Sequence, residues 1–351
     1  MSIGEERALE LIERVRAKPP RFRDEQITMA HGAGGKATAT LIEGLLAPAL
    51  GLDELADAAT VDGLALTSDS FVVKPIRFPG GSIGELAVNG TVNDLAVAGA
   101  RPLALTLSLV LEEGLAAAEL RAEIDAVAAA AETAGVAVVG GDTKVVERGH
   151  ADRMYITTTG LGRTDARASL STRSLRPGDR ILLSGPIGVH GVAIMLARGE
   201  FDLGAEIESD TRSLWPAVDA LLEAVGPSIR CLRDATRGGV ASVVNELSRA
   251  SGVAMVVREA DVPVPPAVAG ACEILGIDPM YVANEGVLVG FVAPVAAAEA
   301  VAALRSVPGH EQAAEIGEVT AEPAGLVLVE TAFGGRRVMD MLVGDPLPRI
   351  C

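Results

Sequence analysis

The sequence predicts a mixed α/β (α+β) protein built from two domains. Its length of 351 residues fits about two domains of ordinary size. Hydrophobic residues make up 49% of the chain and aromatic residues only 3%, so a sizeable core must be filled mainly by Val, Leu, Ile and Ala. Segments typical of strands alternate with segments typical of helices on both sides of a polar, turn-rich stretch at residues 164–179. This order favours two α/β units that meet near that stretch.

Hydrophobic patterning predicts the elements of each unit. In the first unit, the expected strands cover residues 63–73, 102–111, 136–146 and 154–162, and the expected helices cover residues 83–98 and 116–134. The second unit begins with the strand-like run ILLSGP and continues with helices near 189–198, 211–225, 238–250, 267–275 and 294–305, among strands such as GVAMVV and EGVLVGFV. These patterns divide the chain into an extension at 1–28, an N-terminal domain at 29–165, a C-terminal domain at 172–333 and a tail at 334–351.

Charge and cysteine content narrow the function classes. A net charge of -17 disfavours nucleic acid and anionic membranes as partners, because both attract basic surfaces. The three cysteines, Cys231, Cys272 and Cys351, form no C-x-x-C pair and no closed disulfide framework. With a charged N-terminal stretch in place of a signal peptide, the composition predicts a reducing cytoplasm. Cys231 and Cys272 are expected to be small core residues.

A glycine-rich loop, HGAGGK, opens the first domain at residues 31–36. It departs from a Walker A loop because Ala30 stands where the first glycine belongs and Ala37 follows the lysine. Its backbone N–H groups and Lys36 have the chemistry to surround phosphate oxygens, with Gly32, Gly34 and Gly35 allowing a close approach. An ordinary turn into the next helix explains the same residues equally well.

Aspartates recur at expected strand ends and turns. The set comprises Asp57, Asp69, Asp94, Asp142 and Asp234. A single aspartate at a turn is usually a local cap. Several on glycine-rich turns favour a magnesium–phosphate site, because magnesium takes oxygen ligands and shares them with phosphate and water. Asp94 lies in an otherwise apolar helix, where a charge is costly unless it meets a cation.

Three further residues are candidates for proton or charge handling. Lys144 and His150 follow Asp142 in GGDTKVVERGH, and Glu285 precedes a buried strand in ANEG. On these residues alone, a salt-bridge role for Lys144 and Glu285 and a surface position for His150 remain open.

The segment after Gly334–Gly335 is expected to be a proline-containing arm that ends in PRIC. Such an arm of about 16 residues has a reach on the order of 50 Å, so it would let the Cys351 thiol move between solvent and a cleft. A frayed terminus is the alternative.

Together these motifs resemble one known family. HGAGGK, the run TSDSFVVKPIRFPGGSIGELAVNGTVNDLAVAGARP, GDTKVVERG, RDATRGGV, ANEG and PRIC are similar to the HypE family of hydrogenase maturation factors, the carbamoyl dehydratases. That family belongs to the superfamily of aminoimidazole ribonucleotide synthetase, selenophosphate synthetase and thiamine-monophosphate kinase. The resemblance runs from about residue 28 to the end, and PRIC separates this family from the relatives.

The resemblance implies a fold and a reaction. The fold is a two-domain PurM-like fold, with homodimers pairing N-terminal sheets into a β-barrel. The reaction is an ATP-dependent dehydration: the carbamoyltransferase HypF places a carboxamide on the C-terminal cysteine, the S-carboxamide becomes a thiocyanate, and the cyanide passes to iron on a HypC–HypD complex.

The resemblance also implies roles for the residues matched by motif. Cys351 is the covalent carrier, Glu285 the base, Lys144 a group that polarises the carbamoyl oxygen, and His150 a weaker catalytic candidate. ATP and magnesium would be held by the five aspartates, with Gly32, Gly34, Gly35, Lys36, Asn93 and Thr143 as further nucleotide contacts.

Two other functions fit the same motifs. A small-molecule kinase or ligase of the superfamily would leave Cys351 idle, and it would keep its product yield after removal of that cysteine. A scaffold that binds ATP only to switch partners would show no mass change on a carbamoylated Cys351.

Overall fold

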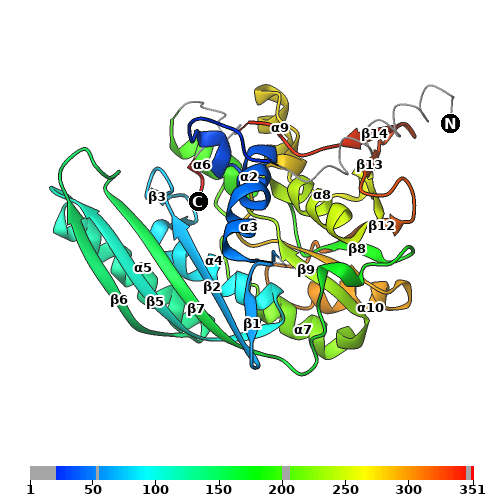
Figure 1. Cartoon of the computed structure of the whole chain (residues 1–351), viewed down its shortest axis with the longest axis horizontal. Coiled ribbons are helices and arrows are strands. Elements are labelled where there is room, and N and C mark those ends of the chain that lie inside the picture. Colours follow the sequence, from blue (N-terminus) through cyan, green and yellow to red (C-terminus); the bar gives the residue numbers. More distant parts are fainter. Residues whose placement is uncertain (1–20, 53–54, 200–205, 345–348) are drawn as a thin grey trace.

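The computed structural model describes residues 21–52, 55–199, 206–344 and 349–351 of the chain. Two β-sheets and their helices lie side by side (Figure 1), and the second sheet is formed after the turn-rich stretch near residue 164. The mixed α/β fold predicted from the sequence is confirmed. In the part of the chain that is described, no helix is both long and apolar enough to cross a membrane.

The N-terminal sheet has the strand order β1-β2-β7-β5-β6. Its strands are β1 Ala59–Val61, β2 Leu64–Phe71, β5 Ala100–Glu112, β6 Ala137–Val146 and β7 Met154–Thr164, and a small hairpin of β3 Arg77–Phe78 and β4 Gly81–Ser82 lies outside it. Strands β5 and β6 are parallel, and β7 is antiparallel to both of its neighbours β2 and β5.

Helix α4, Ile83–Val97, is the central helix of this domain. It is buried along most of its length and packs on β2, β5 and β7, with α5, Ala117–Ala134, packed against it. Helix α4 therefore covers one face of the sheet, and Figure 1 shows the other face of β2, β5, β6 and β7 open. An antiparallel or mixed sheet can leave one face exposed in this way.

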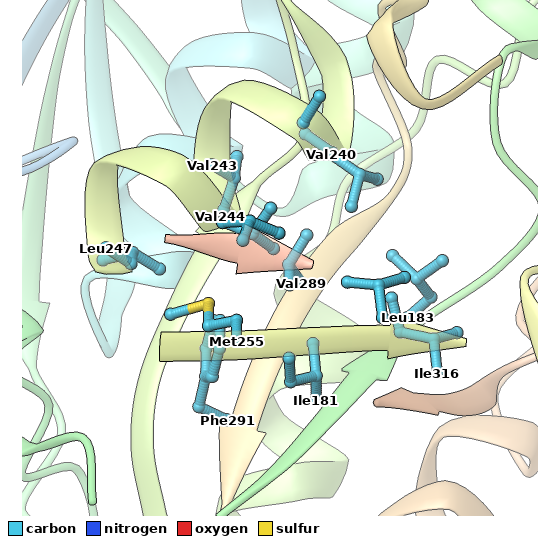
Figure 2. Packing of buried hydrophobic residues seen from close by; sticks show 14 of the residues in the cluster. Ile181, Leu183, Val240, Val243, Val244, Leu247, Met255, Val289, Phe291 and Ile316 are labelled. Atoms are coloured by element: carbon cyan, nitrogen blue, oxygen red, sulfur yellow. The ribbon is translucent and has the colours of Figure 1, made fainter. Parts of the chain in front are cut away.

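The C-terminal sheet has the order β14-β13-β10-β12-β8-β11-β9. Its strands are β8 Arg180–Leu183, β9 Ile229–Asp234, β10 Ala254–Arg258, β11 Leu288–Val292, β12 Ala314–Thr320, β13 Val327–Glu330 and β14 Arg336–Met339. On one face, α8 (Gly239–Ser251) places Val240, Val243, Val244 and Leu247 at helical spacing over the sheet (Figure 2). These side chains meet those of β8, β10, β11 and β12, which form the larger core of this domain.

Other helices connect the two sheets. Helices α7 (Trp215–Val225) and α10 (Ala297–Arg305) share one apolar cluster with Ala96 and Val97 at the end of α4. Helices α6 (Val189–Ala197) and α9 (Pro266–Leu275) join a second cluster that contains Phe71 of β2. Because both clusters cross between the sheets, the N-terminal sheet has a fixed position relative to the C-terminal one.

The glycine-rich loop leads into a short helical segment near the junction. Helix α2, Lys36–Leu41, continues through a π-helical turn at Ile42–Leu46 into α3, Ala47–Leu50. As expected, Cys231 and Cys272 are buried.

The C-terminal segment differs from the expected free arm. Residues Arg336–Met339 form β14 and pair with β13, so the chain stays in the sheet past the expected start of the tail at residue 334. At the other end, Ile350 and Cys351 are buried in the cluster shared with α6, α9 and β2.

Candidate functional site

Three aspartates from separate elements meet where the two sheets adjoin. Asp57 precedes β1, Asp94 lies on α4 and Asp234 ends β9. One carboxylate oxygen from each lies within 4.8 Å of the other two. The apolar run of α4 fixes Asp94 at this point, because the rest of that helix must stay against the sheet. Thr67 Oγ of β2 donates a hydrogen bond to its carboxylate at 2.7 Å.

Burial and mutual repulsion both disfavour the charged form of the triad carboxyl groups. Burial raises the pKa of Asp94 well above its ordinary value, and the charges of Asp234, Asp57 and Asp69 raise it further. Burial and the neighbouring Asp57 raise the pKa of Asp234 to about 8. Arg233 contacts Asp57 and partly offsets the effect of burial on that carboxyl group. One arginine for so many carboxylates leaves negative charge uncompensated.

The donor set fits a divalent cation. Carboxylate oxygens from three elements converge, which is the ligand chemistry that magnesium prefers. A cation bound there would relieve the repulsion that raises the pKa values of Asp94 and Asp234. Asp69, on β2, lies close enough to raise the pKa of both residues.

Glu285 lies in the same region and is almost fully buried, at 3% exposure. One of its carboxylate oxygens, Oε1, has no hydrogen-bond partner among the described residues. Burial raises its pKa well above the ordinary value, and the charges of Asp210, Asp234 and Asp69 add to that effect. A buried carboxyl group with a raised pKa is a candidate for general acid–base catalysis.

Two residues fix the backbone at Glu285. The Asp210 carboxylate accepts hydrogen bonds from the N–H groups of Glu285 and Gly286, at 3.1 and 3.2 Å. The Asn93 amide donates to the carbonyl oxygens of Glu285 and Arg212 and accepts from a third main-chain group. Asn93, predicted as a nucleotide contact, therefore has its side chain occupied in positioning this loop.

Residues 349–351 are docked near Glu285 and Asp69. Val72 N–H donates to the main-chain oxygen of Cys351 at 3.2 Å and Lys74 N–H donates to the Arg349 carbonyl at 3.1 Å, which is the pattern of a short antiparallel pairing. The buried imidazole of His190 contacts the Ile350 carbonyl through Nε2 at 2.6 Å.

Side chains reinforce this docking. The Arg198 guanidinium donates to the Arg349 carbonyl at 2.8 Å and to the Lys74 carbonyl at 3.0 Å. Arg349 in turn forms an ion pair with Asp152. The C-terminal residues thus have main-chain and side-chain contacts with both domains.

The Cys351 thiol lies in an acidic but partly compensated environment. Arg237 Nε donates to its Sγ at 2.8 Å. Burial raises the pKa of the thiol to about 12; the Arg237 charge opposes this, whereas the Glu285 and Asp69 charges add to it. The docked thiol is therefore protonated and unreactive at neutral pH.

The glycine-rich loop is packed against the protein rather than open. A Cβ on Gly34 would lie 2.5 Å from the Arg237 carbonyl, and one on Gly35 would lie 2.4 Å from the Leu342 carbonyl. Lys36 pairs with Asp340 at 2.7 Å. These contacts explain the glycines by close packing, and they place the loop between the triad's β9–α8 connection and the segment that leads to the C-terminus.

Four predicted site residues lie elsewhere in the same chain. Asp142, Thr143 and Lys144 lie on β6, whose residues are almost all exposed, and His150 is exposed in the following turn. Strands β5 and β7 separate β6 from β2, so about 14 Å of sheet lies between these residues and Asp69. The carboxylate of Asp142 pairs instead with Lys144.

The orientation of the strands separates the groups further. Asp142 is aligned with Ser108, Ser108 with Thr157, and Thr157 with Ser70. Aligned residues point to the same face, whereas Ser70 and its neighbour Asp69 point to opposite faces. Within one chain, Asp142 and its ion-pair partner therefore face away from the triad.

Sequence analysis missed three residues of this region: His190, Asp210 and Arg237. Arg237 lies within RDATRGGV, so the motif was noticed but the arginine was not. His190 lies in the first turn of α6, shortly after the glycine that precedes the helix, which is a weak signal. Asp210 has no signal in its local sequence, because its role depends on a loop some 75 residues away.

Comparisons with known proteins identify relatives of the chain. The family model of the AIR synthase related protein N-terminal domain matches residues 55–164, and the model of the AIR synthase related protein C-terminal domain matches residues 176–329. Carbamoyl dehydratase HypE of Rhodobacter capsulatus is 47% identical over 339 residues, which cover 94% of this chain and 99% of the relative. The Escherichia coli K12 protein of the same name is 43% identical, covering 93% and 99%.

Solved structures give the same result. A crystal structure of a HypE–HypF complex contains a chain with 43% identity and a TM-score of 0.82, covering 86% of this chain and 99% of that one. A crystal structure of hydrogenase maturation protein HypE in complex with ATP has 43% identity and a TM-score of 0.80, covering 93% and 100%.

Proposed function

The chain belongs to the AIR synthase related family and, within it, to the HypE carbamoyl dehydratases of hydrogenase maturation, and from this premise we propose that it converts an S-carboxamide on Cys351 into a thiocyanate with consumption of ATP. The thiocyanate would supply the cyanide ligands of the iron in NiFe hydrogenase. The proposal is supported by the burial of Cys351 and Glu285 and by the convergence of Asp57, Asp94 and Asp234 where the two sheets adjoin.

The docked position of Cys351 is the observation that carries this proposal. Its Sγ lies in the electrostatic field of Glu285 and Asp69, and Asp69 acts in turn on the aspartate triad. A carboxamide on that sulfur would extend from a buried position beside a carboxyl group whose Oε1 has no hydrogen-bond partner among the described residues. A kinase that left Cys351 idle would have no use for this docking.

The chemistry explains the need for both ATP and a base. An amide oxygen is a poor leaving group, so ATP first phosphorylates it and phosphate then leaves. Two N–H protons must also be removed as the nitrile forms, and Glu285 is the proposed acceptor. The sum converts one S-carboxamide and one ATP into one thiocyanate, one ADP, one phosphate and one proton.

The cation and nucleotide roles rest on the triad and the glycine-rich loop. Asp57, Asp94 and Asp234 would hold magnesium, which neutralises phosphate charge when bound. Lys36 and the glycines of its loop would contact the phosphate groups. Because Lys36 is paired with Asp340, nucleotide binding would have to replace that ion pair.

The proposed role of Lys144 requires a second copy of the chain. Lys144, with Asp142, Thr143 and His150, lies on or beside an exposed strand at the edge of a sheet with one open face. A homodimer that covers this face, with the two sheets forming a barrel, would bring β6 of one chain toward the site of the other. The nucleotide and catalytic roles of these residues depend on that assembly.

The proposed partners follow from the state of the thiol. The carbamoyltransferase HypF would load Cys351, and a HypC–HypD complex would receive the cyanide, both in the cytoplasm. A solved complex of a similar HypE chain with HypF supports the first partner. Because the docked thiol is protonated, loading would occur with residues 349–351 released.

A single-turnover experiment tests the proposed reaction. The full-length protein is carbamoylated on Cys351 with cyanate, and the mass of the C-terminal peptide is followed after addition of magnesium and ATP. We expect loss of one water and release of one equivalent of phosphate. An unchanged peptide mass, in protein that binds ATP, would contradict the proposed dehydration.

A further inference from the structure

Arg237 is the charged side chain that contacts the docked thiol. It lies in the connection between β9 and α8, and each of its three guanidinium nitrogens has a partner. Nε donates to Cys351 Sγ at 2.8 Å, and a terminal nitrogen donates to the main-chain oxygen of Cys351 at 3.2 Å. The other terminal nitrogen donates to the Gly32 carbonyl at 2.8 Å.

The backbone around Arg237 is closely fixed. Gly238 and Gly239 follow it with φ values of 78° and 61°, a conformation that glycine adopts without strain. The Arg237 carbonyl lies where a Cβ on Gly34 would be, so the glycine-rich loop packs directly on this connection. The guanidinium is therefore presented from a rigid base toward the C-terminal residue.

The chemistry of a guanidinium limits what Arg237 can do. It stays protonated at any physiological pH, so it neither removes nor supplies the protons of the reaction. Its planar, rigid fork of donors fixes two atoms of one residue relative to each other. Its positive charge also balances the carboxylates of Asp69 and Glu285, which act on it electrostatically.

We propose that Arg237 is a positioning residue that holds the Cys351 sulfur in its docked position, called the seat below, and links that seat to the glycine-rich loop. This rests on the proposed function for its purpose, but the seating itself is a property of the unmodified chain. The Nε–H needs only a lone pair as its acceptor, so it can face the sulfur in the thiol, carboxamide and thiocyanate forms. Arg237 makes and breaks no covalent bond.

The link to Gly32 gives the seat a second consequence. One planar group bonds Cys351 on one side and the proposed phosphate loop on the other. If nucleotide binding displaced the loop, the Arg237 side chain would therefore transmit that displacement to the Cys351 sulfur.

Alkylation of Cys351 tests the seat without requiring any turnover. Arg237→Gln removes the charge, and Arg237→Lys keeps the charge but replaces the fork with a single flexible donor group. Full-length protein is treated with iodoacetamide, and the C-terminal peptide is quantified by mass spectrometry, with buried Cys231 and Cys272 as internal references. Arg336→Gln, at an exposed ion pair on β14, is the matched control.

We expect about tenfold or faster alkylation in both Arg237 variants and wild-type alkylation in the control, because hydrogen bonds to charged groups are among the stronger ones. The direction is informative. Loss of the arginine charge at a docked thiol would raise the thiol pKa and slow alkylation, so an increase reports release of the sulfur. Wild-type alkylation rates in both Arg237 variants would overturn the proposal.

The dehydration assay separates this proposal from the proposed function. In carbamoylated Arg237→Gln protein at saturating ATP we expect at least a tenfold slower loss of water. Wild-type dehydration in both Arg237 variants would also overturn the positioning role. If the wild-type protein itself lost no water, the proposed function would fail, while the alkylation result would still decide the seat. If Arg237→Gln did not fold, Arg237→Lys would decide both measurements.

Discussion

At the scale of single residues, the aspartate triad makes proton and cation binding compete. Asp234 has a pKa of about 8 in the folded chain because of burial and the nearby Asp57. Its pKa is higher folded than unfolded, so the folded protein binds more protons between about pH 4 and about pH 8. The free energy of unfolding contributed by this group is therefore largest at low pH and decreases as the pH rises through that window.

Magnesium binding should restore the free energy of unfolding that is lost as the pH rises. We expect the rise in melting temperature on adding magnesium to be small at about pH 6 and to reach about 3 °C or more at about pH 8. Asp94→Asn should greatly reduce this rise, because it removes a ligand and part of the repulsion. The measurement is a thermal melt with and without magnesium at each pH.

Asp125→Asn, at an exposed position on α5, is the control for Asp94→Asn and should behave as wild type. A magnesium effect that is equal in all three proteins, or that is larger at the lower pH, would count against the triad as the cation site.

Glu285 gives a second prediction at this scale. Glu285→Gln keeps the shape of the side chain and the backbone contacts with Asp210 and Asn93, but it removes the base. We expect ATP affinity to stay within about twofold and dehydration of the carbamoylated chain to slow by about a hundredfold or more. Isothermal titration and single-turnover mass spectrometry measure the two effects.

Glu132→Gln, at an exposed position on α5, is the control and should turn over normally. Normal turnover in Glu285→Gln would remove Glu285 as the base.

At the scale of elements, we expect the docking of residues 349–351 to depend on pH, because these residues pack on the buried imidazole of His190. His190 is fully buried, and burial lowers its pKa, although Asp210 and the Ile350 carbonyl oppose this. The remaining neighbours, Ser209 and the Phe78 ring, carry no charge. A histidine with a lowered folded pKa stabilises fully above its unfolded value near pH 6.5, and that stabilisation is lost as the pH falls below it.

Hydrogen exchange at Val72 and Lys74 reports on this docking, because their N–H groups donate to residues 351 and 349. After correction for intrinsic rates, we expect their protection to decrease as the pH falls from about 7.5 to about 5.5. His190→Gln, which offers a donor and an acceptor but does not titrate, should remove this pH dependence. The same pH dependence in His190→Gln would exclude His190 as its origin.

The elements also show how far sequence patterns reach. The apolar run of α4 and the helical spacing of α8 predicted both helices, because each pattern lies in neighbouring residues. The docking of the C-terminal residues had no such pattern, since its partners at Val72 and Lys74 lie far away in the chain. Strand β9 was missed because Arg230, Arg233 and Asp234 interrupt its apolar residues.

The same distinction applies to the candidate site. Residue type and turn position identified Asp57, Asp94 and Asp234, which the fold brings together. They identified Asp142 by the same criterion, and the fold places it at the opposite edge of the sheet. Strand order decides between these cases, and local sequence does not encode strand order.

At the scale of the whole molecule, the open face of the N-terminal sheet predicts self-association. Val61, Leu64 and Leu66 are exposed on β1 and β2 and point to the same face as Asp142. Leu66→Asp places a charge in this apolar patch, and we expect it to shift a dimer toward monomer in analytical ultracentrifugation. Val295→Asp, at an exposed apolar position in the C-terminal domain, should leave the assembly unchanged.

A site completed by a second chain makes a sharper prediction than assembly alone. If Lys144 serves the site of its partner while Glu285 serves its own chain, Lys144→Ala and Glu285→Gln damage different halves of each site. Mixed dimers of the two inactive variants would then contain one intact site out of two. With random pairing, half of the dimers are mixed, so co-expression should restore about a quarter of wild-type dehydration.

Each variant expressed alone should stay inactive, and a mixture that also carries Leu66→Asp in both chains should not recover. Recovery is measured as loss of water from the carbamoylated Cys351 peptide, resolved by variant, because only the chain that retains Glu285 should be converted. Absence of recovery in demonstrated mixed dimers would mean that Lys144 does not act across the interface. Given its position on the opposite face of the sheet from Asp69, Lys144 would then have no route to the site, and its proposed catalytic role would fail with the shared site.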